Sequence, residues 1–182
     1  MPVLLWIEVS ACGFTTIMGA ASALTVLAQG PARRLNQLLA ALLGLLSAWG
    51  GAALTLRFLL WLDMGRPTLW LELATVALSG SGILLPAVVS RYVEKPARPA
   101  DLAAIAGVLA LVLAAVPAFG GVLLTEPGLT SVGTVAYRVL PGGYVASLLA
   151  VSYLLWGLVL LWRHRHRRAP DRVSPSRLVA AV

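Results

Sequence analysis

Three ionisable side chains inside long apolar stretches have the clearest chemical potential in this sequence. Glu8, Arg57 and Glu72 each lie one to two helical turns from the same predicted boundary of a hydrophobic run. A charge at such a place is costly unless it pairs or lines a polar cavity. Their depths match at the rise of an α-helix, so we predict that Arg57 lies within salt-bridging distance of Glu8, Glu72 or both.

These three residues form the candidate binding site. An excess of carboxylate over guanidinium favours a cation or a proton as the ligand. The alternative is a purely structural cluster, because pairing alone explains why the charges are tolerated.

A second constellation is a run of small residues followed by a proline, Ser79, Gly80, Ser81, Gly82 and Pro86. This combination predicts a loosened or kinked helix near mid-membrane. Broken helices expose backbone carbonyls to the substrates of secondary transporters. The alternative is a proline kink that neighbouring hydroxyl groups accommodate.

Motifs for catalysis, metal binding or cofactor binding are absent from the sequence. It has no paired catalytic carboxylates, no glycine-rich phosphate loop and no nucleophile with a base in reach. Cys12 is the single cysteine, and His164 and His166 lie in a run of arginines that repels a metal cation. We therefore expect a non-enzymatic protein with no catalytic residue, no metal and no cofactor.

The elements that must position these residues are long apolar helices. The chain of 182 residues is 59% hydrophobic and only 12% charged, with a mean hydropathy of +0.89. A water-soluble domain of this size cannot bury so much apolar surface. The composition and spacing predict an all-α, polytopic transmembrane bundle with five helices, at residues 3–28, 37–62, 68–92, 102–124 and 141–162.

The positive residues predict the orientation of the bundle. Eleven Lys and Arg residues follow or flank helices 1, 3 and 5: Arg33, Arg34, Arg91, Lys95, Arg98, Arg163, Arg165, Arg167, Arg168, Arg172 and Arg177. Only Arg66 and Arg138 lie on the other side. Positive loops remain in the cytoplasm, so we expect the N-terminus outside and the C-terminus inside a bacterial inner membrane. The net charge of +7 then indicates contact with anionic lipid headgroups and not with nucleic acid.

Three further expectations concern the connections and the packing. Residues 125–141 form either a short amphipathic surface helix or a re-entrant segment.

Residues 1–168 form the membrane domain, and 169–182 form a disordered basic tail. A row of small residues on the second helix, Ala40, Gly44, Ala48 and Ala52, predicts a close helix interface.

Residues 6–93 resemble the N-terminal membrane region of some bacterial seven-helix sensor histidine kinases and diguanylate cyclases. The resemblance rests on the basic turn Pro31-Ala32-Arg33-Arg34-Leu35-Asn36, on the central Trp49 and on Leu84-Leu85-Pro86. It covers about half of the chain. It implies a sensory, signal-input role, and because we predict five helices and no output domain, that role requires a separate protein partner.

A sensory or accessory role is therefore the leading functional hypothesis. The first rival is a membrane-embedded binding component of a transporter, and the second is a structural subunit of a larger membrane complex. A cavity that reaches residues 79–86 favours transport, whereas a shallow outer pocket at Glu8, Arg57 and Glu72 favours sensing. A tightly packed bundle with neither favours the structural subunit.

Overall fold

The chain was analysed as a computed structural model, which describes residues 3–93, 98–115, 123–131 and 134–168. The predicted all-α bundle of five helices is confirmed. The helices are α1 (Val3–Ala28), α2 (Arg34–Leu62), α3 (Pro67–Tyr92), α4 (Arg98–Ala115) and α5 (Pro141–Arg168), and the strands are β1 (Gly128–Leu129) and β2 (Val135–Ala136). Four of the helices, α1, α2, α3 and α5, are long and apolar enough to cross a membrane, which is the architecture of a multi-span membrane protein.

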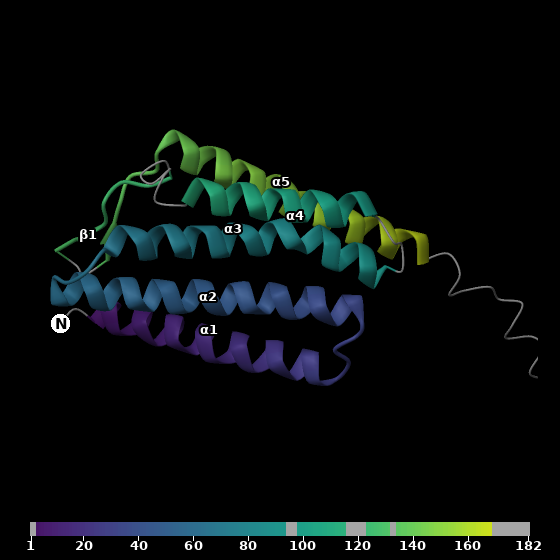
Figure 1. Cartoon of the computed structure of the whole chain (residues 1–182), viewed down its shortest axis with the longest axis horizontal. Coiled ribbons are helices and arrows are strands. Elements are labelled where there is room, and N and C mark those ends of the chain that lie inside the picture. Colours follow the sequence, from purple (N-terminus) through teal and green to yellow (C-terminus); the bar gives the residue numbers. More distant parts are fainter. Residues whose placement is uncertain (1–2, 94–97, 116–122, 132–133, 169–182) are drawn as a thin grey trace, which may run out of the picture.

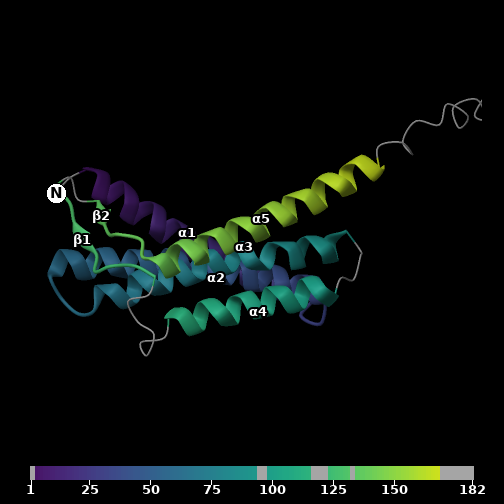
Figure 2. The ribbon, with the colours of Figure 1, turned by 90° about the horizontal axis from the view of Figure 1, so that it is seen from above.

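The helices lie side by side in up-and-down order (Figure 1). α1 packs on α2, α2 on α3, and α3 on both α4 and α5. Figure 2 shows α4 and α5 on different sides of α3. α3 is therefore the central helix, and 72% of its apolar window is buried, against 11% for α1 and for α5.

The two ends of the bundle differ in what they carry. The N-terminus, the turn between α2 and α3 and the two strands lie at one end, which we call the hairpin end (Figure 1). The turn between α1 and α2 and the C-terminus of α5 lie at the other, which we call the basic end because it carries Arg33, Arg34, Arg91, Arg163 and Arg165.

Helix α4 and the segment after it differ from the sequence prediction. The described part of α4 has 18 residues, which corresponds to about 27 Å, and Leu124 lies in a β-bridge with Val139 instead of in a helix. Residues 125–141 form neither a surface helix nor a re-entrant segment where the structure describes them. They form an antiparallel hairpin in which Gly128 pairs with Ala136 and Leu129 with Val135. The β-branched residues Val135 and Val139 favour this extended pairing.

The predicted break in the third helix is not found as an interruption of secondary structure. α3 is continuous through Ser79–Gly82 and contains Pro86 in its interior. It bends toward its C-terminal end (Figure 1), as a proline that cannot donate a backbone hydrogen bond permits. The hydroxyl groups of Ser81 and Ser90 donate to the carbonyl oxygens of Leu78 and Ala87 within the same helix.

The predicted row of small residues on α2 is buried at its two ends, at Ala40 and Ala52, and it is not the contact with α1 at its centre. A Cβ atom on Gly44 would meet nothing within 4 Å, and Ala48 is exposed. The contact instead runs through Gly50, whose added Cβ would lie 2.8 Å from the Thr16 hydroxyl, and through Ser47, which donates to the Thr16 carbonyl at 2.7 Å. The small residues of α2 occur on more than one face, so their spacing alone did not identify the right one.

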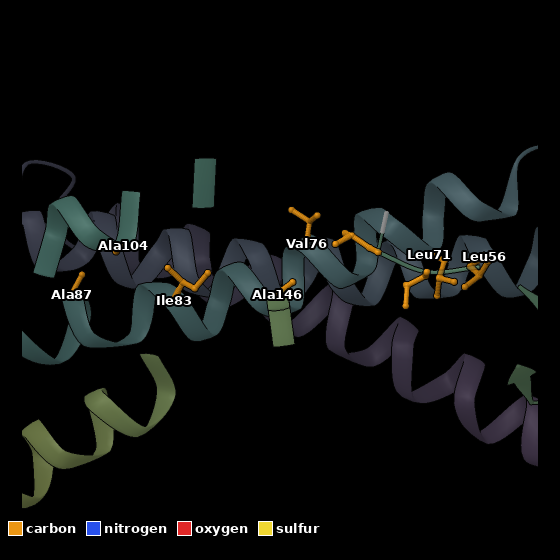
Figure 3. Packing of buried hydrophobic residues seen from close by; sticks show 9 residues of the cluster. Leu56, Leu71, Val76, Ile83, Ala87, Ala104 and Ala146 are labelled. Atoms are coloured by element: carbon orange, nitrogen blue, oxygen red, sulfur yellow. The ribbon is translucent and has the colours of Figure 1, made fainter. Parts of the chain in front are cut away.

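The core follows α3 along the bundle (Figure 3). Ile83 is fully buried and packs against Gly107 of α4, where an added Cβ would lie 2.8 Å from the Ile83 side chain. On another side of α3, Gly82 approaches the backbone of Ala150, and Gly157 of α5 approaches Leu85. Small residues thus allow α4 and α5 to approach α3 closely, as helix association in lipid requires.

Candidate functional site

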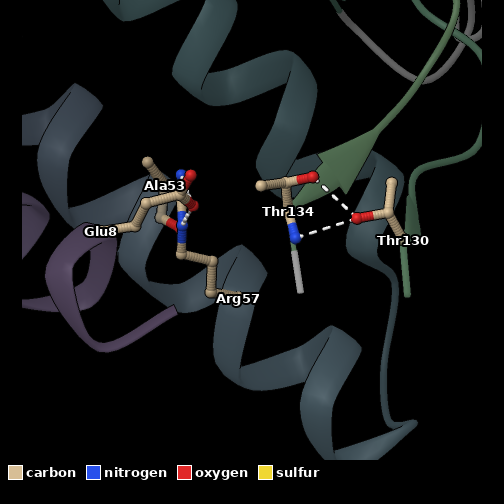
Figure 4. Close-up of polar contacts among 5 residues, drawn as sticks. All are labelled: Glu8, Ala53, Arg57, Thr130 and Thr134. Atoms are coloured by element: carbon tan, nitrogen blue, oxygen red, sulfur yellow. Dashed lines mark hydrogen bonds and ion pairs between the residues drawn. The ribbon is translucent and has the colours of Figure 1, made fainter. Parts of the chain in front are cut away.

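Arg57 and Glu8 form an ion pair between α2 and α1 (Figure 4). The Nε and Nη2 atoms of Arg57 both lie 2.8 Å from Oε2 of Glu8. Nη1 donates to the Ala53 carbonyl one turn earlier in α2, at 2.9 Å. The side chains are 16% exposed for Arg57 and 31% exposed for Glu8. The predicted contact of Arg57 with a carboxylate is thus confirmed for Glu8.

Glu72, the third residue of the predicted site, lies in α3 and is 4% exposed. It has an interaction partner, and the preceding residue, Leu71, shares a cavity wall with Arg57. Its membership in a cluster of three charges stays a prediction.

A cavity of about 370 Å³ lies beside Arg57 at the hairpin end. Its walls come from four helices and from the hairpin segment. α1 contributes Cys12, α2 contributes Trp49 and Arg57, and α3 contributes Thr75 and Ser79. Neither Glu8 nor Glu72 contributes to the described lining, so Arg57 is the charged residue of that lining.

The hairpin segment and the start of α5 close another side of the cavity. Val135, Tyr137 and Val139 line it from the hairpin, and Gly143 and Ser147 line it from α5. Gly143 has to be glycine here, because an added Cβ would collide with the carbonyl oxygen of Leu123. This close approach holds the N-terminal turn of α5 against the base of the hairpin.

Hydrogen bonds fix the hairpin that forms this wall. The backbone N–H of Thr125 donates to the Arg138 carbonyl at 2.9 Å, and the N–H of Arg138 donates to the Thr125 hydroxyl at 2.8 Å. Nearer the tip, the hydroxyl groups of Thr130 and Thr134 lie 2.7 Å apart (Figure 4). The wall is therefore tied at its base and near its tip.

Thr75 and Ser79 are the hydroxyl-bearing residues of α3 in the described cavity lining. Thr75 donates to the carbonyl oxygen of Leu71 in its own helix, as Ser81 and Ser90 do to Leu78 and Ala87. Ser79 is 7% exposed. Because a hydroxyl group can both donate and accept a hydrogen bond, Ser79 gives the cavity wall a polar group that can contact a guest.

The cavity ends at Ser79 on the described length of α3. Leu71, Ala74, Thr75, Leu78 and Ser79 line it, and no described residue of α3 beyond Ser79 does. From Ser79 toward the basic end, α3 makes close contacts with α4 and α5 at glycines. The buried side chains of Ile83 and Pro86 fill the space there. The site is therefore a pocket near one end of the bundle.

A second ion pair, at the basic end, was not anticipated from the sequence. Nη2 of Arg91 lies 2.7 Å from Oδ2 of Asp101 and joins α3 to the first turn of α4. Within the described residues, the buried Arg91 Nε and Asp101 Oδ1 have no hydrogen-bond partner. The available signal was an acidic residue at the start of an apolar helix, ten positions after an arginine at the end of the previous one.

The structure also shows the surroundings of residue types that could bind a metal, for which the sequence predicts no metal site. Among the described residues, no group of three or more His, Cys, Asp or Glu side chains is placed to hold a metal ion. His166 lies at the basic end of α5 with its ring 4.6 Å from that of Trp162, in an edge contact. The predicted tail at 169–182 lies outside the described residues.

Comparison of the chain with models of protein families, with curated proteins and with solved structures finds no match. The case for function therefore rests on the cavity and its surroundings.

Proposed function

We propose that this chain is the ligand-binding, signal-input component of a membrane sensor, without catalytic activity of its own. The observation that carries the proposal is the pocket of about 370 Å³ beside Arg57. Its volume falls in the range of small-molecule sites, roughly 300–1,000 Å³. It combines apolar walls with a few polar groups, which is the usual composition of such sites.

The placement of the pocket suits the detection of an external ligand. The bias of positive residues puts the basic end in the cytoplasm of a bacterial cell and the hairpin end outside. A small molecule would then enter from the non-cytoplasmic side, and anionic headgroups would contact the arginines of the basic end.

Helix α5 provides a physical link from the pocket to the cytoplasmic side. Gly143 and Ser147 line the pocket near its start, and the helix continues for 28 residues, or about 42 Å. Hydrocarbon is only about 30 Å thick, and α5 extends past the other helices at the basic end (Figure 2). A shift of its first turn on ligand binding would be transmitted along a rigid helix to a partner that carries the output domain, the role that the resemblance to sensor kinases and cyclases implies.

The pocket meets the two criteria from the sequence only in part, because it reaches Ser79, the first residue of the small-residue run, and contains Arg57 but neither Glu8 nor Glu72 in its described lining. We favour sensing because of how the pocket ends. A transporter needs access to its binding site from both sides of the membrane, and the packing of α3 below Ser79 supports closure on the basic side. A purely structural subunit needs no pocket.

The test is to fill the pocket and to follow both ligand response and partner binding. Ala74 lines the pocket and is buried, so Ala74→Phe should occupy it. The neighbouring Leu73 is 44% exposed, so Leu73→Phe is the matched control. The tagged proteins are purified from native membranes, their partners are identified by mass spectrometry, and their melting temperatures are measured with and without fractionated small molecules from the growth medium.

We expect the wild type and Leu73→Phe to co-purify with a kinase or cyclase and to melt at a higher temperature with one fraction. Ala74→Phe should retain the partner and lose the shift. Recovery of the wild type with a transport ATPase, or alone and unresponsive to every fraction, would contradict the proposal.

A further inference from the structure

We infer that the ligand of this pocket is a small organic anion, with an acceptor group such as a carboxylate and an apolar body. The inference rests on the proposed function, because it names the chemical class that the same site would take. It differs from the expectation from the sequence, in which the excess of acidic residues favoured a cation.

The described wall of the pocket contains one charged residue, and it is basic. Arg57 is the charged residue in the described lining, and Glu8, its ion-pair partner, lies outside it. Glu8 and Ala53 engage three of the five N–H donors of the guanidinium, and arginine has no acceptor. Two N–H donors of Arg57 remain for a guest, and although Glu8 balances much of the charge, the residue in the lining offers donors and no acceptor.

Uncharged hydrogen-bond donors surround the pocket as well. Ser79 lines the pocket, and its hydroxyl group can donate a hydrogen bond to an anion. Gly143 lies in the first turn of α5, where backbone N–H groups lack intrahelical acceptors and the helix dipole is positive. Arg57 and the start of α5 both favour an anion, and the Ser79 hydroxyl can donate a hydrogen bond to it.

The remaining walls of the pocket are apolar and indicate an apolar body for the ligand. Trp49, Leu56, Leu71 and Leu78 line the same pocket, and the volume of about 370 Å³ lies at the small end for ligand sites. An inorganic anion would leave these apolar walls without contact. A compact organic acid, or a similar amphiphilic anion, would contact the apolar side chains and accept hydrogen bonds from the donors of the pocket.

The single cysteine of the chain gives a direct test, because Cys12 lines the pocket. Purified protein in lipid nanodiscs is treated with three methanethiosulfonates: the neutral methyl, the anionic sulfonatoethyl and the cationic trimethylammonioethyl reagent. Modification rates are followed by intact-mass spectrometry and divided by the rates with a free small thiol. Cys12→Ser is the control for unspecific labelling.

The neutral reagent should react, and the anionic reagent should react faster than the cationic one by about tenfold, as expected for a cleft of one charge sign. Glu8→Gln should increase this preference, and Arg57→Gln should abolish it. If Arg57→Gln does not fold, the comparison of the wild type with Glu8→Gln still tests the inference. Removal of Glu8 must increase the ratio of the anionic to the cationic modification rate.

Equal or faster reaction of the cationic reagent, with normal reaction of the neutral one, would overturn the anion inference and leave the pocket and the proposed sensor intact. No reaction of Cys12 even with the neutral reagent would overturn both, because the pocket would then not be accessible.

Discussion

Arg57 links the packing of the bundle to its candidate chemistry. Its guanidinium holds α1 through Glu8, anchors to its own helix at Ala53 and lines the pocket. The sequence was sufficient to predict the contact with Glu8, because both residues are charged and lie at the same depth of apolar helices. It was not sufficient to predict which side of the guanidinium faces a cavity, since that depends on Trp49, Ser79 and the hairpin.

At this scale we expect Arg57→Ala to destabilise the protein more than Glu8→Ala does. Loss of Arg57 removes two hydrogen bonds and an ion-pair contact and leaves a carboxylate that is only 31% exposed without its partner. Loss of Glu8 leaves Arg57 bound to the Ala53 carbonyl and next to the pocket. The expected difference is about 1–3 kcal/mol, reduced by the partial exposure of the pair.

The measurement is thermal unfolding of both variants in the same detergent, with Glu8→Gln as an isosteric control. A larger loss of melting temperature for Glu8→Ala than for Arg57→Ala would show that the pair is not organised around the guanidinium.

At the scale of elements, the lengths of the apolar stretches and the turn residues between them were enough to locate the helices approximately. The faces through which the helices pack and the structure of their connections were not predictable. Helix α2 has small residues on several faces, and only the partner helix decides that Gly50 and not Gly44 is at the interface. The hairpin was missed because its strands have two residues each, too few for an alternating pattern. Helix α5 continues through Arg163–Arg168, because arginine is a good helix former outside the apolar stretch.

The two glycines of α2 make a matched pair for a test of this interface. A Cβ at Gly50 would lie 2.8 Å from the Thr16 hydroxyl and 2.9 Å from the Cys12 carbonyl, whereas a Cβ at Gly44 meets nothing within 4 Å. Gly50→Ala should therefore destabilise the protein by about 1–3 kcal/mol through overpacking. Gly44→Ala should be neutral or slightly stabilising because alanine favours the helix. Equal melting temperatures of the two variants in detergent would refute this assignment of the α1–α2 interface.

At the scale of the whole molecule, the bundle has two chemically different ends. The pocket and the hairpin lie at one end, and the arginines after α1 and within the C-terminal turns of α5 lie at the other. Such an asymmetry orients helices in a membrane, and it decides whether the pocket samples the outside of the cell or the cytoplasm. The central claim of a sensor for an external ligand depends on this orientation.

The most direct measurement is cysteine labelling in intact cells with a membrane-impermeant maleimide, in a Cys12→Ser background. Met64 is the reporter for the hairpin end, because it is 62% exposed and the neighbouring Asp63 and Gly65 have positive φ angles that disfavour substitution. Arg34, exposed at the start of α2, reports on the basic end. We predict that Met64→Cys is labelled in intact cells and that Arg34→Cys is labelled only after permeabilisation. Labelling of Arg34→Cys but not of Met64→Cys in intact cells would place the pocket at the cytoplasmic side and contradict the account.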